Sequence, residues 1–292
     1  MDNLANISLM KDKSHRIVAW SLLAGLLFLR LAVWGGIGSF SNPDWLRPVY
    51  DIGTYLYTAC LIWWERDRLA DFHIDRLALA VIILFKPVQT ILLVVIWRAN
   101  ENPLAFPNLP SLAFWIIALG LFLALWLSHA PLPKLSRLSF GWFGVGILVG
   151  FIATLITAYP ASLQIDKSQI QIYSTSDNLA LLLQAPGYFF YHLGYAAVSE
   201  EPLFRAFLWV YLHKAGWKTI WIWLFQAALF TLAHIYYITK LPISFWLIVP
   251  LAGLIFGALV WRSKTISSSL AAHATMNALV ETMSYIVASF RL

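Results

Sequence analysis

Long apolar runs dominate the chain and constrain what it can fold into. About nine segments approach the roughly 20 mostly apolar residues that a membrane-spanning helix needs. They lie near residues 17–37, 49–64, 77–97, 111–129, 141–158, 182–212, 219–238, 243–262 and 265–290. A backbone that crosses a bilayer must satisfy its own hydrogen bonds. The pattern therefore predicts an all-α fold, a polytopic transmembrane helical bundle of about eight or nine spans, in which the short segment 49–64 is the weakest candidate.

Composition supports a membrane protein. Charged residues make up 12% of the 292 residues and hydrophobic residues 60%, whereas a soluble domain carries about 25% charged residues. Many of the fifteen tryptophans stand near the ends of apolar runs, as in "IWWER" and "VVIWR". Aromatic side chains at such positions lie at the level of the lipid headgroups. We therefore expect an integral, multi-pass membrane protein in contact with the lipid bilayer.

Charge and cysteine content exclude several other classes of protein. The formal net charge is +6, but the basic residues are scattered through short loops and form no patch for nucleic acid. The single cysteine, Cys60, excludes an internal disulfide and a cysteine-rich metal site. Lys11, Lys13 and Arg16 precede the first apolar run, and no small-residue cleavage site follows it. This run is expected to be an uncleaved transmembrane helix rather than a signal peptide.

Loop charges predict the orientation. Cytoplasmic loops collect Lys and Arg, and an N-terminus inside the cell places 12 such residues in inside segments and five in outside segments. We therefore predict a cytoplasmic N-terminus, provided that segment 49–64 spans. Residues 1–292 are predicted to form one membrane domain, because no repeat or soluble domain is visible. Within it, residues 1–180 supply spans without a recognised motif, and residues 181–292 supply the helices in which most of the candidate functional residues lie.

Ionisable residues within apolar segments are costly and are functional candidates by default. The nine candidates weighed here are Arg30, Lys86, His192, Glu200, Glu201, Arg205, His234, His273 and Glu281. For Arg30 and Lys86 we expect snorkelling or a structural pairing. His192, in "YFFYHLGY", fits a neutral, hydrogen-bonded core histidine. Glu281 has no positive partner at helical spacing, so solvation or a structural hydrogen bond explains it best.

The stretch "SEEPLFRAF" carries two adjacent carboxylates. Glu201 and Arg205 are four residues apart, so on a helix they share a face and can form an ion pair. Glu200 is rotated by about 100° from Glu201 and points elsewhere. A purely structural ion pair leaves Glu200 unexplained, because a second buried carboxylate adds a desolvation cost without adding a positive partner. Glu200 is therefore predicted to be available for water.

Two further pairs have the same four-residue spacing. Phe230 precedes His234 in "FTLAH", and His273 precedes Asn277 in "HATMN", which puts the members of each pair on one helical face. Each pair alone is more often a satisfied core feature. Together these groups suit amide hydrolysis, which needs a base for water and donors for an oxyanion. Glu200, whose ionised form burial disfavours, would be the base, with His234 orienting the water and with His273 and Asn277 as the oxyanion donors.

The order EExxxR, FxxxH, HxxxN resembles the CPBP family of intramembrane glutamic endopeptidases, which includes CAAX prenyl proteases and bacteriocin-processing enzymes of the Ras-converting-enzyme type. The resemblance covers residues 199–277. It implies that Glu200 and His234 activate water and that His273 and Asn277 stabilise the oxyanion. It also implies supporting roles for Glu201, Arg205 and Phe230. Pro202 suits a helix start, which suggests that the long segment 182–212 is two helices joined near the carboxylates.

Other functions remain open at this point. Two histidines and a carboxylate can hold zinc, but no HExxH pair exists and Asn277 suits an oxyanion better, so no cofactor is expected. A non-catalytic membrane immunity or scaffold protein could use the same polar cluster to bind a partner. A proton-coupled transporter is less favoured, because no repeat halves are visible. For an endopeptidase, the expected partner is a membrane-associated peptide or protein, either a prenylated CAAX protein or a leader peptide.

Overall fold

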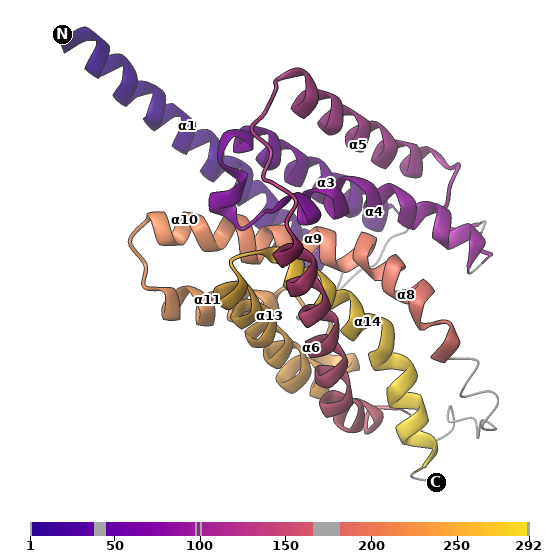
Figure 1. The fold of residues 1–292 in the computed structure, drawn as a ribbon. Coiled ribbons are helices and arrows are strands. Elements are labelled where there is room, and N and C mark those ends of the chain that lie inside the picture. Colours follow the sequence, from indigo (N-terminus) through magenta and orange to yellow (C-terminus); the bar gives the residue numbers. More distant parts are fainter. Residues whose placement is uncertain (1, 38–44, 97, 100, 166–181, 291–292) are drawn as a thin grey trace.

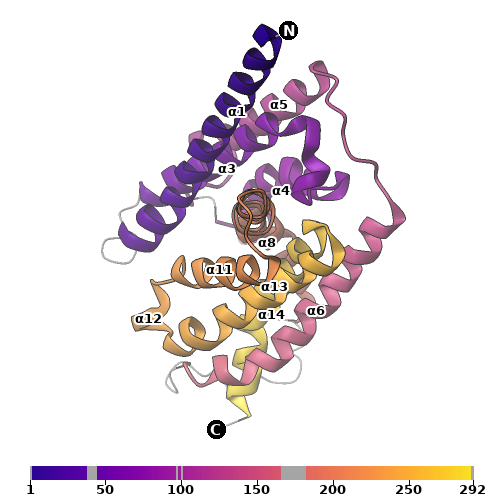
Figure 2. The ribbon, with the colours of Figure 1, turned by 90° about the vertical axis from the view of Figure 1, so that its left-hand side faces the viewer.

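The computed structural model describes residues 2–37, 45–96, 98–99, 101–165 and 182–290. Every regular element in this part of the chain is helical, which confirms the predicted all-α class. The helices form two layers with a single helical run between them (Figures 1 and 2).

The first layer comes from the N-terminal part of the chain. It contains α1 (Asp2–Phe28) with its π-helical continuation η1 (Leu29–Ile37), then α3 (Leu46–Trp64), the short 3₁₀ segment η2 (Arg66–Phe72), α4 (Arg76–Val95) and α5 (Leu109–Leu127). Helix α3 packs against α1 and α5, and α4 packs against α5. These helices form the upper layer in Figure 2.

The second layer combines one earlier helix with the C-terminal part of the chain. It contains α6 (Arg137–Ser162), α11 (Thr219–Leu232), the short α12 (Tyr237–Lys240), η6 (Ser244–Ile248), α13 (Val249–Ser263) and α14 (Ile266–Ser289). Helix α14 packs against both α6 and α13, and α11 packs against α13. These helices form the lower layer in Figure 2.

A central helical run lies between the layers. It consists of α8 (Ala185–His192), η4 (Leu193–Ala197), α9 (Val198–Glu201), η5 (Pro202–Phe207) and α10 (Leu208–Lys214). Figure 2 views this run almost along its axis. The run contacts α3 and α4 on one side and α14 on the other. The two adjacent carboxylates lie in its middle, so both layers can supply side chains to them.

Pro202 begins a new helical element, as predicted, but the helical run does not break there. The backbone stays helical into the proline, because Glu201 has φ −63° and ψ −44°. Proline lacks the N–H that would continue the α-helical ladder, and the segment that begins at Pro202 is π-helical instead. π-Helical turns within α-helices often occur at functional sites. Here two of them, η4 and η5, flank the single α-helical turn that carries Glu200.

Helices α6 and α14 pack very closely at two glycines. A Cβ atom on Gly146 would lie 2.1 Å from the carbonyl oxygen of Ser268, and one on Gly150 would lie 2.4 Å from that of Ala272. Both contacts advance in the same direction along the two helices, so α6 and α14 run parallel. Small residues spaced in this way let backbones approach within a membrane. The second contact lies next to His273.

Asp75 ties the start of α14 to the start of α4. Its carboxylate accepts hydrogen bonds from the backbone N–H of Ala78, at 2.8 Å, and from the hydroxyls of Thr265 and Ser267, at 2.8 and 2.6 Å. One side chain thereby caps one helix and anchors another from the opposite layer. This link fixes the position of the helix that carries His273 and Asn277.

Five described helices are long and apolar enough to cross a membrane: Ser14–Ile37, Arg76–Val95, Leu109–Leu127, Arg137–Ser162 and Ser244–Ser263. They support an integral membrane protein. The other four predicted segments do not meet the same criterion. Residues 182–212 are divided among short helical pieces, and α11 has only 14 residues. The total of eight or nine spans therefore stays a prediction.

Candidate active site

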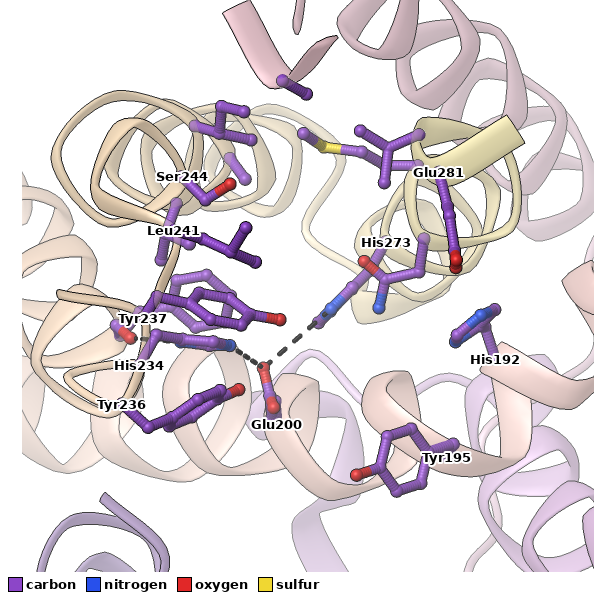
Figure 3. Close-up of a pocket in the computed structure, with 18 of the residues that line it drawn as sticks. His192, Tyr195, Glu200, His234, Tyr236, Tyr237, Leu241, Ser244, His273 and Glu281 are labelled. Carbon is purple, nitrogen blue, oxygen red and sulfur yellow. Dashed lines mark hydrogen bonds and ion pairs between the residues drawn. The ribbon is translucent and has the colours of Figure 1, made fainter. Parts of the chain in front are cut away.

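A cavity of about 550 Å³ opens beside the central run, and Glu200, His234, His273 and Asn277 all line it. Glu200 comes from α9, His273 and Asn277 come from α14, and His234 follows the end of α11. Figure 3 shows the side chains of Glu200, His234 and His273 converging from three directions. The structure thus brings together four residues that the sequence presents in three separate motifs.

Glu200 is buried, with an exposed fraction of 4%, and it has a cationic partner. Its Oε1 atom lies 2.6 Å from Nη2 of Arg30, which is itself only 3% exposed. The interpretation that Glu200 lacks a positive partner is therefore wrong, and so is snorkelling of Arg30. A guanidinium at this distance favours the ionised carboxylate and opposes the effect of burial. The expected structural pairing of Arg30 does exist, but it is made with the candidate base.

Arg30 is held by two more side chains. Its Nη1 donates to the hydroxyl of Tyr50 on α3 at 3.0 Å, and its Nη2 lies 3.1 Å from Nε2 of His234. Because a guanidinium only donates hydrogen bonds, Nε2 of His234 is the acceptor. The first layer therefore contributes a fixed cation that contacts both Glu200 and His234.

The end of α11 fixes the ring of His234. The backbone N–H of His234 donates to Thr231, so the carbonyl of Phe230 lacks the usual helical partner four residues later. The Nδ1 atom of His234 lies 2.8 Å from that carbonyl. A carbonyl accepts only, so Nδ1 carries the proton and Nε2 is the acceptor of the neutral ring. This Nε2 atom lies 3.8 Å from Oε2 of Glu200.

Glu201 forms the predicted ion pair. Its Oε1 atom lies 3.2 Å from Nη1 of Arg205, which confirms the pairing inferred from their spacing. Arg205 also lies over the ring of Phe230, with 4.3 Å from its guanidinium carbon to the ring centre. Both Glu201 and Arg205 are fully buried. The structure thereby groups the three residues that were predicted to support the site.

Glu201 also orients His273. The same Oε1 atom lies 2.8 Å from Nδ1 of His273, which must donate because a carboxylate accepts. Nε2 of His273 is consequently directed to the cavity and lies 3.9 Å from Oε2 of Glu200. That oxygen has no hydrogen-bond partner among the described residues. Figure 3 marks the two long contacts from Glu200 to His234 and His273, which exceed the length of direct hydrogen bonds.

Charges within the site balance. Two buried carboxylates, Glu200 and Glu201, face two buried guanidiniums, Arg30 and Arg205. An unpaired buried charge is strongly destabilising, so each carboxylate needs its own guanidinium partner in order to be buried here. Among the described residues, no group of three or more His, Cys, Asp or Glu side chains has the geometry to hold a metal ion.

Several residues of the cavity were missed or misinterpreted from the sequence. His192 and Glu281 both line it, as do Tyr195, Tyr236 and Tyr237. The Nδ1 atom of His192 is buried and has no hydrogen-bond partner in the described part of the chain. The expectation that His192 is a hydrogen-bonded core histidine is therefore wrong for this atom. Tyr236 and Tyr237 follow His234 after one intervening residue, Ile235, and this proximity in sequence is the signal that could have indicated them.

Residues 182–279 match a family model described as type II CAAX prenyl endopeptidase Rce1-like. This match confirms the family resemblance. It includes all three motifs and covers about a third of the chain. No curated protein and no solved structure matches the chain significantly. Similarity to the Rce1-like endopeptidases supports a CAAX-type intramembrane protease, a hydrolase that acts on peptide substrates. Arg30 and Tyr50 lie outside the matched residues.

Proposed function

We propose that the chain is an intramembrane endopeptidase of the glutamic type, in which Glu200 activates water for attack on a peptide bond. One observation carries the proposal. Oε2 of Glu200 has no hydrogen-bond partner among the described residues, and it faces Nε2 of His234 and of His273 at 3.8 and 3.9 Å. A water molecule that bridges these atoms would make hydrogen bonds of ordinary length. It would lie in a cavity large enough for a peptide segment.

The proposed reaction begins with proton transfer. Glu200 accepts a proton from water while the water oxygen bonds to the carbonyl carbon, which gives a tetrahedral oxyanion. The ring of His234 accepts the second hydrogen bond from the water through Nε2, which exchanges its contact with Nη2 of Arg30 for the water, because a neutral imidazole has a single acceptor nitrogen. The proton on Glu200 then passes to the amide nitrogen, the C–N bond breaks, and the products are a carboxylic acid and an amine. The carboxylate is thus regenerated at the end of each cycle.

Asn277 and His273 are proposed to stabilise the oxyanion. The side-chain amide of Asn277 can donate from its nitrogen. Because Nδ1 of His273 donates to Glu201, its Nε2 atom can donate only when the ring is an imidazolium. The carboxylate of Glu201, at 2.8 Å, stabilises that cation. In this proposal Glu201 acts through His273, and Arg205 and Phe230 hold Glu201 in place.

Arg30 is proposed as a positioning residue. Its contact with Oε1 leaves Oε2 as the only oxygen of Glu200 that faces the histidines. The cation also keeps the carboxylate ionised and therefore able to accept a proton.

Substitution of Glu200 by glutamine tests the proposed function. Gln is nearly isosteric but cannot accept a proton from water, so Glu200→Gln should abolish cleavage while expression and thermal stability persist. We would compare the membrane peptidomes of cells that carry the wild type or Glu200→Gln. The expected result is a precursor that accumulates only with the variant. A fully active Glu200→Gln protein would refute the assignment.

The same variant separates the alternatives. A non-catalytic immunity or scaffold protein predicts that Glu200→Gln and Asn277→Ala keep the wild-type phenotype. A transporter predicts proton-coupled uptake into vesicles. Activity that is lost with a chelator and restored by zinc would replace the glutamic mechanism by a metal mechanism.

We further propose a substrate class and an orientation. The substrate is a membrane-associated peptide, either of the prenylated CAAX type or a leader peptide, and the N-terminus is cytoplasmic with eight or nine spans. The single cysteine allows a direct test of topology. With Cys60 replaced by Ala, a cysteine at Asp71 should react with membrane-impermeant maleimide only from the cytoplasm, and one at Glu101 only from outside. The reverse pattern would overturn the orientation.

A further inference from the structure

One face of α14 lines the cavity well beyond the candidate catalytic residues. His273, Asn277, Glu281 and Tyr285 all line it and are four residues apart, as expected for a single helical face. Glu281 is eight residues beyond His273, which corresponds to about 12 Å along the helix at 1.5 Å per residue. The cavity therefore extends from the catalytic groups to a second carboxylate.

This second carboxylate is not neutralised by any residue that the structure describes. Glu281 is exposed and forms no ion pair among the described residues. Among the described residues that line the cavity, Arg30 is the one Lys or Arg, and it is paired with Glu200. Figure 3 shows Glu281 on α14 and His192 on α8 at the same side of the cavity. That side carries a negative charge that a bound cation would complement.

Apolar side chains line the cavity between and opposite these two polar regions. Met276 and Val280 alternate with the polar residues of α14, and Ile248, Val249 and Ala252 line the cavity from η6 and α13. A peptide in this cavity would place apolar side chains next to the scissile bond and a charged side chain farther along. The arrangement is selective, because a carboxylate on the peptide would be repelled by Glu281.

We propose that Glu281 is a specificity-determining residue that binds the Lys or Arg side chain of a substrate three or four residues from the scissile bond. An extended peptide advances about 3.3 Å per residue, so three or four residues span the distance along α14 from His273 to Glu281. The substrate class is thus a membrane-associated peptide with apolar residues beside the cut and a basic residue beyond them. This inference rests on the proposed peptidase function.

A positional peptide library tests the proposal. The wild-type protein in liposomes is incubated with N-palmitoylated peptides in which Lys, Gln, Glu and Leu vary over ten positions, and products are identified by mass spectrometry. We expect Lys to be enriched about fivefold over Gln, three or four residues from the cut on one side, as for a partly solvated ion pair. Glu281→Gln should abolish this enrichment, and Glu281→Lys should replace it with a preference for Glu.

A matched control removes a charge elsewhere. Glu101 is exposed in the loop before α5 and does not line the cavity, so Glu101→Gln should keep the preference for Lys. Wild-type products without enrichment of Lys, or enrichment that survives in Glu281→Gln, would overturn the inference.

Failure of the subsite differs from failure of the proposed function. Cleavage that depends on Glu200 but shows no preference for Lys would refute only the proposed cation subsite. Absence of any cleavage, or cleavage that persists in Glu200→Gln, would refute the proposed peptidase function. A binding measurement tests the subsite even where no cleavage is seen. Peptides that bind to the Glu200→Gln protein should still be enriched in Lys. This enrichment should be lost when Glu281→Gln is added to the same protein. Retention without that enrichment counts against a cation subsite in any function.

Discussion

Arg30 and Glu200 form a buried ion pair, with 2.6 Å between Nη2 and Oε1. The two residues come from opposite parts of the chain, and only Glu200 lies in the segment that matches a known family. The N-terminal helices therefore do more than anchor the protein. They supply a cation that contacts both the candidate base and His234, so the candidate active site is complete only when the first layer packs against the central run.

Removal of this cation should slow the proposed reaction. For Arg30→Gln we expect kcat to fall about 10- to 100-fold, the effect of losing one hydrogen bond to a charged group. KM should change little, because in the proposal Arg30 holds Glu200 and does not contact the substrate. Steady-state cleavage of a peptide substrate in liposomes measures both constants.

Arg30→Lys provides the control for this prediction. Lysine keeps the positive charge but has no planar fork to contact two partners, so its kcat should lie between those of the wild type and Arg30→Gln. Equal losses in the two variants, or a wild-type kcat in Arg30→Gln, would contradict a positioning role.

The proposed oxyanion donor Asn277 makes a separate prediction. Asn277→Ala removes a donor that acts on charge that develops in the transition state, so kcat should fall about 10²- to 10³-fold. Thermal stability in detergent should stay close to that of the wild type, because no described residue forms a hydrogen bond with this side chain. Single-turnover kinetics would measure the loss in the chemical step. A variant with unchanged turnover would remove Asn277 from the proposed mechanism.

Sequence patterns predicted the local features of the site and missed the long-range features. The Glu201–Arg205 pair followed from a spacing of one helical turn, which is a local property. The Arg30–Glu200 pair could not be found in this way, because the two residues meet only after two layers have packed. The expectation that solvation or a structural hydrogen bond explains Glu281 agrees with its exposure, but its place on the wall of the cavity depends on the same packing and has no signal in the sequence.

The positions at which helices end are also poorly predicted from the sequence. The apolar run 219–238 predicted one helix through His234, but α11 ends at Leu232. That end frees the carbonyl that orients the histidine ring. Hydropathy alone carries no signal for such an end. The π-helical turns beside Glu200 are likewise set by packing and by Pro202, not by a hydrophobic period.

Close packing of α6 on α14 predicts a sensitivity at Gly150. A methyl group there would lie 2.4 Å from the carbonyl of Ala272, so Gly150→Ala must shift α14 beside His273. We expect lower thermal stability, by about 1–3 kcal/mol for overpacking, together with lower activity.

Gly144→Ala is the matched control for this packing prediction, because nothing lies within 4 Å of a Cβ at that position of the same helix. It should keep wild-type stability and activity. Thermal unfolding in detergent compares the two variants. Equal melting temperatures for Gly150→Ala and Gly144→Ala would contradict the close contact seen between α6 and α14.

A third buried ion pair, outside the cavity, predicts an asymmetry between its two members. Nζ of Lys86 lies 3.7 Å from Oδ2 of Asp51, and both side chains are almost fully buried. Removing one partner of such a pair costs about 3–5 kcal/mol, whereas replacing both by apolar groups is often neutral.

Asp51 also interacts electrostatically with Arg47. Lys86→Met should therefore destabilise the protein less than Asp51→Leu, and the double variant should be more stable than Asp51→Leu. Unfolding free energies from a double-mutant cycle measure the coupling, and strictly additive effects would show that the pair does not contribute as a unit.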